Sequence, residues 1–143
     1  MMKRQSQPWM SAEDYGKSLK GFGVNLLVEE IARSVAFQVE VLGAKIVYSD
    51  VDFAVIQIGA ATWMLHADHT YSDHPLQGSL GPGMIRGLGM ELRVYDLDPD
   101  ACEARARERG DTVLAGAMDK PHGLREVFIV DPDGYLWVPS QSL

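Results

Sequence analysis

The chain has 143 residues, and its length suits one compact domain with an ordinary hydrophobic content of 46%. The net charge of −7 argues against nucleic acid, which binds basic surfaces, and no apolar run is long enough to span a bilayer. The one cysteine, Cys102, leaves no internal disulfide, so we expect a cytoplasmic protein without membrane or nucleic-acid partners.

Residues 1–21 form an arm outside the regular pattern that follows. Ser11, with Glu13 two residues later, resembles a helix start, because a serine side chain caps the first free N–H groups and acids favour the first turn. The arm also carries Trp9 and Tyr15. We expect it to pack across a sheet edge or onto a second subunit.

Residues 22–66 predict a first module with the order β-α-β-β-β. Apolar residues alternate over 22–28, which indicates a strand, and recur at helical spacing over 31–42. Gly43 closes this helix. Three further β-rich runs are predicted at 45–49, 53–58 and 62–66.

Residues 67–88 are glycine-rich and predict a linker to a second module, 89–143. Asp98 and Pro99 predict the start of a helix that ends at Gly110. The sequence D-P-D-G at 131–134 predicts a tight turn. The predicted strands are 90–95, 112–117, 125–130 and 135–140.

The two modules are one pattern used twice. Val28 corresponds to Val94, and Glu30 to Asp96, at the same offset of 66. We therefore predict an α+β fold, in which two tandem βαβββ modules form a curved, cleft-lined mixed sheet with the helices on the outside. The whole chain, 1–143, is then a single domain.

The strand face turned away from the helices is the candidate ligand cleft. Side chains alternate between faces along a strand, which places Trp63 and Trp137 on the helix side, in the core. The other face mixes apolar and polar groups, as a ligand cleft does. The simpler alternative is that Glu91 and Arg93 only pair with each other or stay solvated. The predicted cleft residues are Asn25, Phe53, Gln57, Met64, His66, Glu91, Arg93, Glu126, Phe128 and Val138.

Three histidines, His66, His69 and His74, lie where a strand enters a loop. His-x-x-His can bind a transition metal. No helix fixes this spacing, however, so we interpret the run as ordinary loop histidines. Cys102 has no activating base nearby, and we expect a buried small hydrophobe.

Two segments resemble the vicinal oxygen chelate superfamily, which includes glyoxalase I, extradiol dioxygenases and bleomycin-resistance proteins. They are V-E-E-I-A-R-S-V-A-F-Q…L-G-A and G-L-R-E-V-F-I-V-D-P-D-G-Y-L-W, and the resemblance covers about 22–140. The family's enzymes hold a divalent metal at four positions. The resemblance places Gly23, Met64, Gly89 and Val138 there, and none of these is a ligand for a hard cation.

The resemblance therefore implies a metal-free member with no cofactor, a small-molecule binding protein that sequesters its ligand as antibiotic-resistance relatives do. We expect a cationic or aromatic ligand, because Glu91 and Glu126 lie on the cleft face. The alternative is a metal-dependent lyase, isomerase or dioxygenase, with the metal held by residues such as His66, Glu91 and Glu126. No catalytic residue is predicted. Relatives of this length pair, so a homodimer is also expected.

Overall fold

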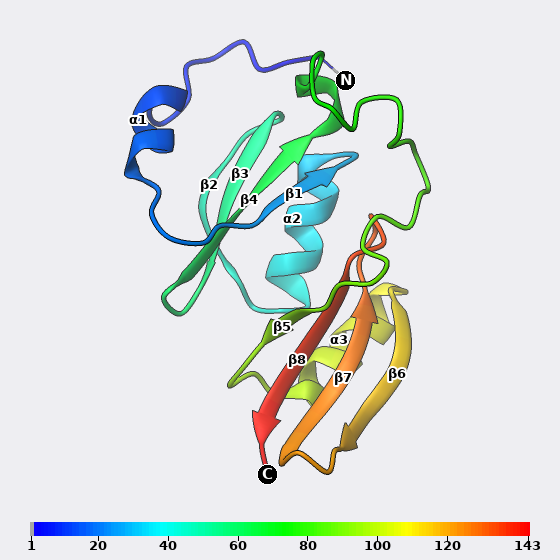
Figure 1. Cartoon of the computed structure of the whole chain (residues 1–143). Helices are drawn as coiled ribbons and strands as arrows, with labels where there is room; N and C mark the ends of the chain where they lie inside the picture. Colours follow the sequence, from blue (N-terminus) through cyan, green and yellow to red (C-terminus); the bar gives the residue numbers. More distant parts are fainter. Residues whose placement is uncertain (1) are drawn as a thin grey trace.

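The computed structural model describes residues 2–143 and has two four-stranded mixed sheets, one in each module (Figure 1). The predicted α+β class with tandem βαβββ modules is confirmed. The first sheet has the order β1-β4-β3-β2, and the second has the order β5-β8-β7-β6. The first module contains β1 (Asn25–Val28), α2 (Ile31–Glu40), β2 (Lys45–Ser49), β3 (Phe53–Ile58) and β4 (Ala61–Ala67). The second contains β5 (Leu92–Val94), α3 (Pro99–Arg109), β6 (Thr112–Asp119), β7 (Leu124–Val130) and β8 (Leu136–Ser142).

Helix boundaries follow local chemistry. The Asp98 carboxylate accepts the N–H groups of Asp100 and Ala101 at the start of α3, and Gly110 ends that helix with a φ of +84°. In the arm, Ser11 Oγ accepts the N–H of Asp14 at 3.0 Å and caps α1 (Ala12–Ser18), as predicted. None of the helices within 2–143 has the length and apolarity needed to cross a membrane.

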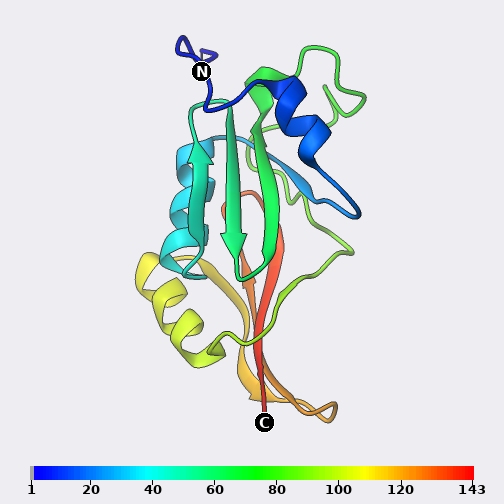
Figure 2. The same ribbon diagram turned by 90° about the vertical axis from the view of Figure 1, so that its left-hand side faces the viewer.

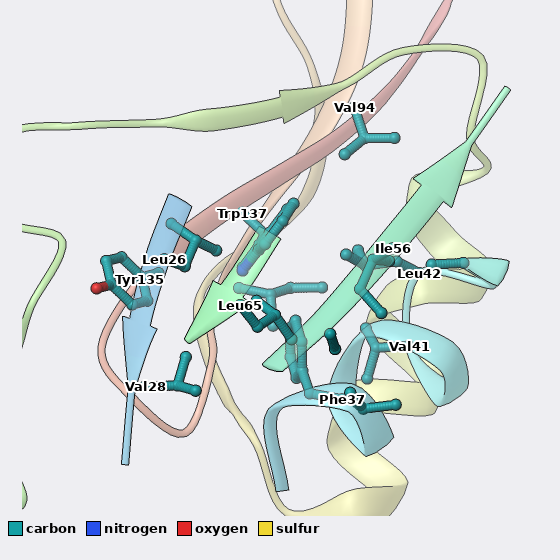
Figure 3. Packing of buried hydrophobic residues seen from close by; sticks show 14 of the residues in the cluster. Leu26, Val28, Phe37, Val41, Leu42, Ile56, Leu65, Val94, Tyr135 and Trp137 are labelled. Atoms are coloured by element: carbon teal, nitrogen blue, oxygen red, sulfur yellow. The ribbon is translucent and has the colours of Figure 1, made fainter. Parts of the chain in front are cut away.

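The core lies between the sheets and the helices α2 and α3, which lie on the same side of the molecule (Figure 2). It is one cluster, because Phe37 and Leu65 of the first module and Trp137 of the second belong to the same packed set (Figure 3). The rings of Trp63 and Trp137 are 5.5 Å apart, and Trp63 Nε1 donates to Gln38 Oε1 of α2 at 2.6 Å. Both tryptophans therefore face the helices, as predicted.

Cys102 is fully buried in α3, as predicted for a small hydrophobe. Burial raises the pKa of its thiol to about 11, against a smaller opposing effect of Arg105. The thiol is therefore protonated and unreactive at neutral pH.

The D-P-D-G turn joins the two modules. Asp133 Oδ1 accepts the N–H of Glu29, which precedes α2, at 2.8 Å. Gly134 lies so close to the linker that a Cβ on it would stand 2.5 Å from Ile85 Cα, and its φ is +85°. Only glycine suits both constraints.

Arg86 anchors the linker to the first module. Its side chain is 2% exposed and forms two hydrogen bonds of 2.7 Å with the Asp68 carboxylate, just after β4 in the short helix η1 (Asp68–Thr70). Its Nη1 also donates to the carbonyl of Leu27 in β1 at 3.0 Å. The buried, paired guanidinium holds the C-terminal part of the connection against the first sheet.

Two strands are shorter than predicted. β1 covers Asn25–Val28 and not 22–28, and β5 covers Leu92–Val94 and not 90–95. Each is the outer strand of its sheet and pairs with one neighbour only, β4 or β8. The residues before each strand continue the apolar alternation but have no paired residue on β4 or β8. The alternation alone therefore overestimates the strand length.

Candidate functional site

The N-terminal arm lies across the face of the first sheet, on the opposite side from α2 (Figure 2). Trp9 stacks on Tyr48 of β2 with centroids 5.3 Å apart, and Tyr15 meets Phe53 of β3 edge-on at 5.4 Å. Arg4 Nη1 donates to Asp50 Oδ2 at 2.7 Å. Aromatic packing and an ion pair thus fasten the arm to its own sheet.

A cavity of about 360 Å³ lies between this arm and the first sheet. Trp9 and Tyr15 line it from the arm, and Phe53 and His66 line it from β3 and β4. Asp52 is at its border, where its Oδ1 accepts from the Arg4 N–H at 3.0 Å and lies 2.8 Å from His69 Nε2. The wall combines these aromatic rings with the charged groups of Lys3, Arg4 and Asp52, and apolar walls with a few polar groups are typical of small-molecule sites.

His66 is held by a short hydrogen-bonded chain. Its Nδ1 lies 2.6 Å from Asn25 Oδ1, and Asn25 Nδ2 donates to the Tyr71 hydroxyl at 3.0 Å. The imidazole also packs on Phe53 with centroids 4.7 Å apart. Burial, and then the nearby positive charge of Arg4, lower the pKa of His66 to about 4. His66 is therefore neutral at physiological pH.

The three histidines of the loop run do not converge. His69 bonds to Asp52, and His74 Nδ1 accepts the N–H of Leu76 at 3.0 Å. Across residues 2–143, no group of three His, Cys, Asp or Glu side chains is placed to hold a metal ion. Tyr71 separates His66 from His74, with its ring 5.4 Å from the first and 4.7 Å from the second.

The polar residues of the second sheet form an ion cluster around Arg93 on β5. Its guanidinium donates to Glu91 Oε2 at 2.8 Å and also to Glu126 Oε2 of β7. His122 Nε2 lies 3.3 Å from that same Glu126 oxygen. Burial opposes ionisation of Glu126, whose side chain is 3% exposed, but the bonds from Arg93 and His122 outweigh it and lower its pKa. Both acids thus already share an internal cation.

The predicted cleft residues fall into two groups that no hydrogen bond or ion pair connects within the part of the chain described. Asn25, Phe53 and His66 meet on the first sheet, and Glu91, Arg93 and Glu126 meet on the second. The other four lie elsewhere on the two sheets. Met64 lines a separate cavity of about 310 Å³ under the end of the arm, Gln57 donates to Gly59 O, Lys120 lies over the Phe128 ring, and Val138 pairs with Arg93 in register.

The expected match of Met64 to a family metal position is wrong. Leu27 pairs with His66 in the first sheet, and Arg93, its counterpart at the offset of 66, pairs with Val138 in the second. His66 therefore occupies the place that Val138 occupies in the second module. The error has a geometric cause: a two-residue turn joins β3 to β4, whereas five residues join β7 to β8, so counting from the turn glycine misplaces the strand.

Sequence reasoning missed Tyr48 and Tyr71 as site residues. Tyr48 reaches the aromatic face because β2 carries a bulge between Ile46 and Tyr48, which shifts the alternation by one residue. Tyr71 lies in the loop after η1, where no periodicity applies. The only signal for it was its position among the histidines of H-A-D-H-T-Y.

A larger cavity, about 620 Å³, lies between the two modules. Its walls include the core residues Trp63 and Trp137 and the already paired Glu91 and Arg93. Phe22 stands at its border with 93% of its surface exposed. We regard the arm cavity as the better candidate because His66, its polar residue on β4, forms no ion pair.

The comparisons with known proteins agree with this architecture. The family model of the glyoxalase/bleomycin resistance protein/dioxygenase superfamily matches residues 23–138, and the chain belongs to this superfamily. Among curated protein sequences no match was found.

Solved structures with the same fold have low sequence identity. A glyoxalase-related enzyme from Fulvimarina pelagi superposes with a TM-score of 0.67 at 19% identity, covering 87% of this chain and 89% of that one. A glyoxalase/bleomycin resistance protein/dioxygenase family enzyme from Burkholderia phytofirmans PsJN gives 0.68 at 17%, covering 84% and 96%. TioX from Micromonospora sp. ML1 gives 0.62 at 20%, covering 87% and 97%. These similarities establish the fold and not a reaction.

The residues at the family's metal positions do not fit a divalent metal. With the register corrected, the four positions hold Gly23, His66, Gly89 and Val138. Only the histidine offers a donor atom, its Nε2, because Nδ1 is bonded to Asn25. A hard cation needs several oxygen or imidazole ligands, which this set lacks.

Proposed function

We propose that this protein binds a small aromatic molecule in the cavity between its N-terminal arm and its first sheet, without a metal. The observation that carries the proposal is the cavity of about 360 Å³ with Trp9, Tyr15, Phe53 and the neutral His66 in its wall. Such a site favours a planar apolar ligand and can sequester it from water. An aromatic antibiotic is one ligand of this kind. On the single cysteine, we also propose a cytoplasmic location.

The charges favour an aromatic ligand over a cationic one. The two acids that suggested a cationic partner, Glu91 and Glu126, are both bonded to Arg93. A ligand cation would have to compete with this internal guanidinium, whose bonds to the acids are already formed. In the arm cavity, Arg4 is paired with Asp50, and Lys3 adds a positive charge that disfavours a cationic ligand.

Calorimetric titration with indole tests the proposal. We expect saturable binding that Phe53→Ala weakens about fivefold or more, because the variant removes an aromatic wall. Phe22→Ala is the matched control, since that phenylalanine is 93% exposed and lies outside this cavity. Unchanged binding in Phe53→Ala, or no binding by the wild type, would contradict the proposal.

Metal content separates this function from the enzymatic alternative. Protein purified without a histidine tag should contain less than one equivalent of Zn, Ni, Fe or Mn. A tightly held equivalent, with loss of stability on chelation, would instead favour a metal-dependent lyase, isomerase or dioxygenase.

We also propose that the chain forms a homodimer. The outer strands β1 and β5 are unpaired on one side, and several large apolar residues near them are exposed: Phe22 at 93%, Leu88 at 81%, Tyr95 at 56% and Met90 at 44%. Surfaces of this kind are covered by association. Light scattering at micromolar concentration should give twice the chain mass of 15.8 kDa, and a monomer mass would contradict the proposal.

A further inference from the structure

His66 has one ring nitrogen whose role is fixed by its neighbours. Asn25 turns its carbonyl oxygen toward His66 Nδ1 and its amide nitrogen toward the Tyr71 hydroxyl. A carbonyl oxygen only accepts hydrogen bonds, so the proton between the two residues belongs to Nδ1. In the neutral imidazole, the other nitrogen, Nε2, then carries a lone pair and no proton.

The lone pair of Nε2 faces the cavity. The two ring nitrogens point in divergent directions, and Nδ1 points to Asn25 on β1, at the edge of the sheet. Nε2 is thereby directed toward β3 and the arm, where Phe53 and Tyr15 line the cavity. Among residues 2–143, no protein group donates a hydrogen bond to it.

Two polar side chains beside His66 in the cavity wall already have hydrogen-bond partners. The Asp52 carboxylate accepts from the Arg4 backbone and contacts His69, and Thr70 Oγ1 donates to the Ala67 carbonyl at 2.7 Å. Burial keeps His66 uncharged, with a pKa of about 4, so Nε2 remains an acceptor at neutral pH. A ligand that fills the cavity displaces water from this nitrogen and must replace the lost hydrogen bond itself.

We propose that His66 Nε2 selects, among aromatic ligands of this cavity, those that carry a hydroxyl or N–H donor on the ring edge. This inference rests on the proposed function, because it names the ligand class of the same cavity. The ring of such a ligand packs between the aromatic side chains of the arm and Phe53, and its donor reaches Nε2. A ring of the same shape without a donor leaves a buried acceptor unpaired, which costs about tenfold to a hundredfold in affinity.

Two isosteric probes, indole and benzofuran, test the selection by calorimetric titration at pH 7. They have nearly the same shape, but only indole has an N–H donor. In the wild type, we expect indole to bind about tenfold tighter or more. His66→Phe keeps a ring on Phe53 and removes both nitrogens, so the two probes should then bind with similar affinity.

Asn25→Leu provides a second variant, because it removes the group that holds the proton on Nδ1 and should also reduce the preference for indole. Phe22→Ala should leave that preference unchanged. Equal binding of both probes to the wild type, a preference for benzofuran, or a preference that survives His66→Phe would overturn the selection by His66 while leaving aromatic binding intact. Failure of both probes to bind would overturn the proposed function, and this inference with it.

Discussion

The two modules share one fold but present different chemistry on corresponding faces. The first sheet carries a neutral aromatic set, in which His66 and Phe53 lie under an arm that the second module lacks. The second carries an ion cluster, with Arg93 between Glu91 and Glu126. At corresponding positions, His66 is matched by Val138 and Leu27 by Arg93. The repeat therefore preserves backbone pairing while the side chains on the faces have diverged, which is what separate roles require.

The largest effect should come from breaking the joint between the modules. Gly134→Ala places a methyl group 2.5 Å from Ile85 Cα at a residue whose φ is +85°, so both the linker and the turn must move. We expect a loss of about 2–5 kcal/mol in the free energy of unfolding. Urea unfolding followed by fluorescence measures it.

The matched control is Gly123→Ala, whose φ is +88° but whose added Cβ would meet nothing within 4 Å. It isolates the cost of backbone conformation, about 1–2 kcal/mol. If the two variants lose the same stability, the turn is not a tight joint.

A smaller effect should distinguish the two acids of the second module. Glu126→Gln removes the charge of a carboxylate that is 3% exposed and leaves Arg93 short of one partner, so we expect a loss of about 1–2 kcal/mol. Glu91→Gln changes a side chain that is 43% exposed and should cost less than about 1 kcal/mol. Thermal melts of both variants check the order. A larger loss for Glu91→Gln would show that exposure does not rank the two ion pairs.

A further prediction concerns how the stability of the two modules depends on pH. The pKa of His66 is lowered to about 4 from 6.5, so between these values the unfolded chain binds more protons, and His66 reduces stability as pH falls. In the second module, burial raises the pKa of Asp131 to about 6, although the hydrogen bonds it accepts oppose this shift. The folded chain therefore binds more protons at Asp131 than the unfolded chain as pH falls from 6 to 4, and Asp131 increases stability over that range. Urea unfolding at pH 7 and pH 5 should show a smaller acid loss in His66→Phe than in the wild type. Equal losses would mean that His66 titrates normally in the folded chain.

Local chemistry explains why much of the fold could be predicted. The α3 boundaries follow from Asp98, Pro99 and Gly110, all of which act within a turn of the helix. The strands β2 and β3 match the predicted ranges, because both are bounded by turn residues. The lengths of β1 and β5 and the register of β4 depend on pairing with distant strands, which alternation along one strand does not encode.

The candidate site was predictable only in part for the same reason. Alternation brought His66, Phe53 and Asn25 to one face, and the structure places them in contact. Arg93 and Glu126 are 33 positions apart in the chain, and their ion pair forms only because β5 and β7 belong to the same sheet. The sequence therefore could not decide whether the acids bind a ligand cation or an internal arginine. The docking of Trp9 on Tyr48 is also a long-range contact, and the pattern of the arm allowed a second subunit equally well.

The connection between the modules looks like a flexible tether, since it is long and rich in glycine, yet Arg86 divides it. The hydrogen bonds of Arg86 to the first module convert one long loop into two shorter ones. Shorter loops have less conformational entropy, so the linker allows the modules less relative motion. The spacing of the modules is then independent of the length of the segment before the anchor, 72–80. Residues could be inserted there without altering how the two sheets face each other.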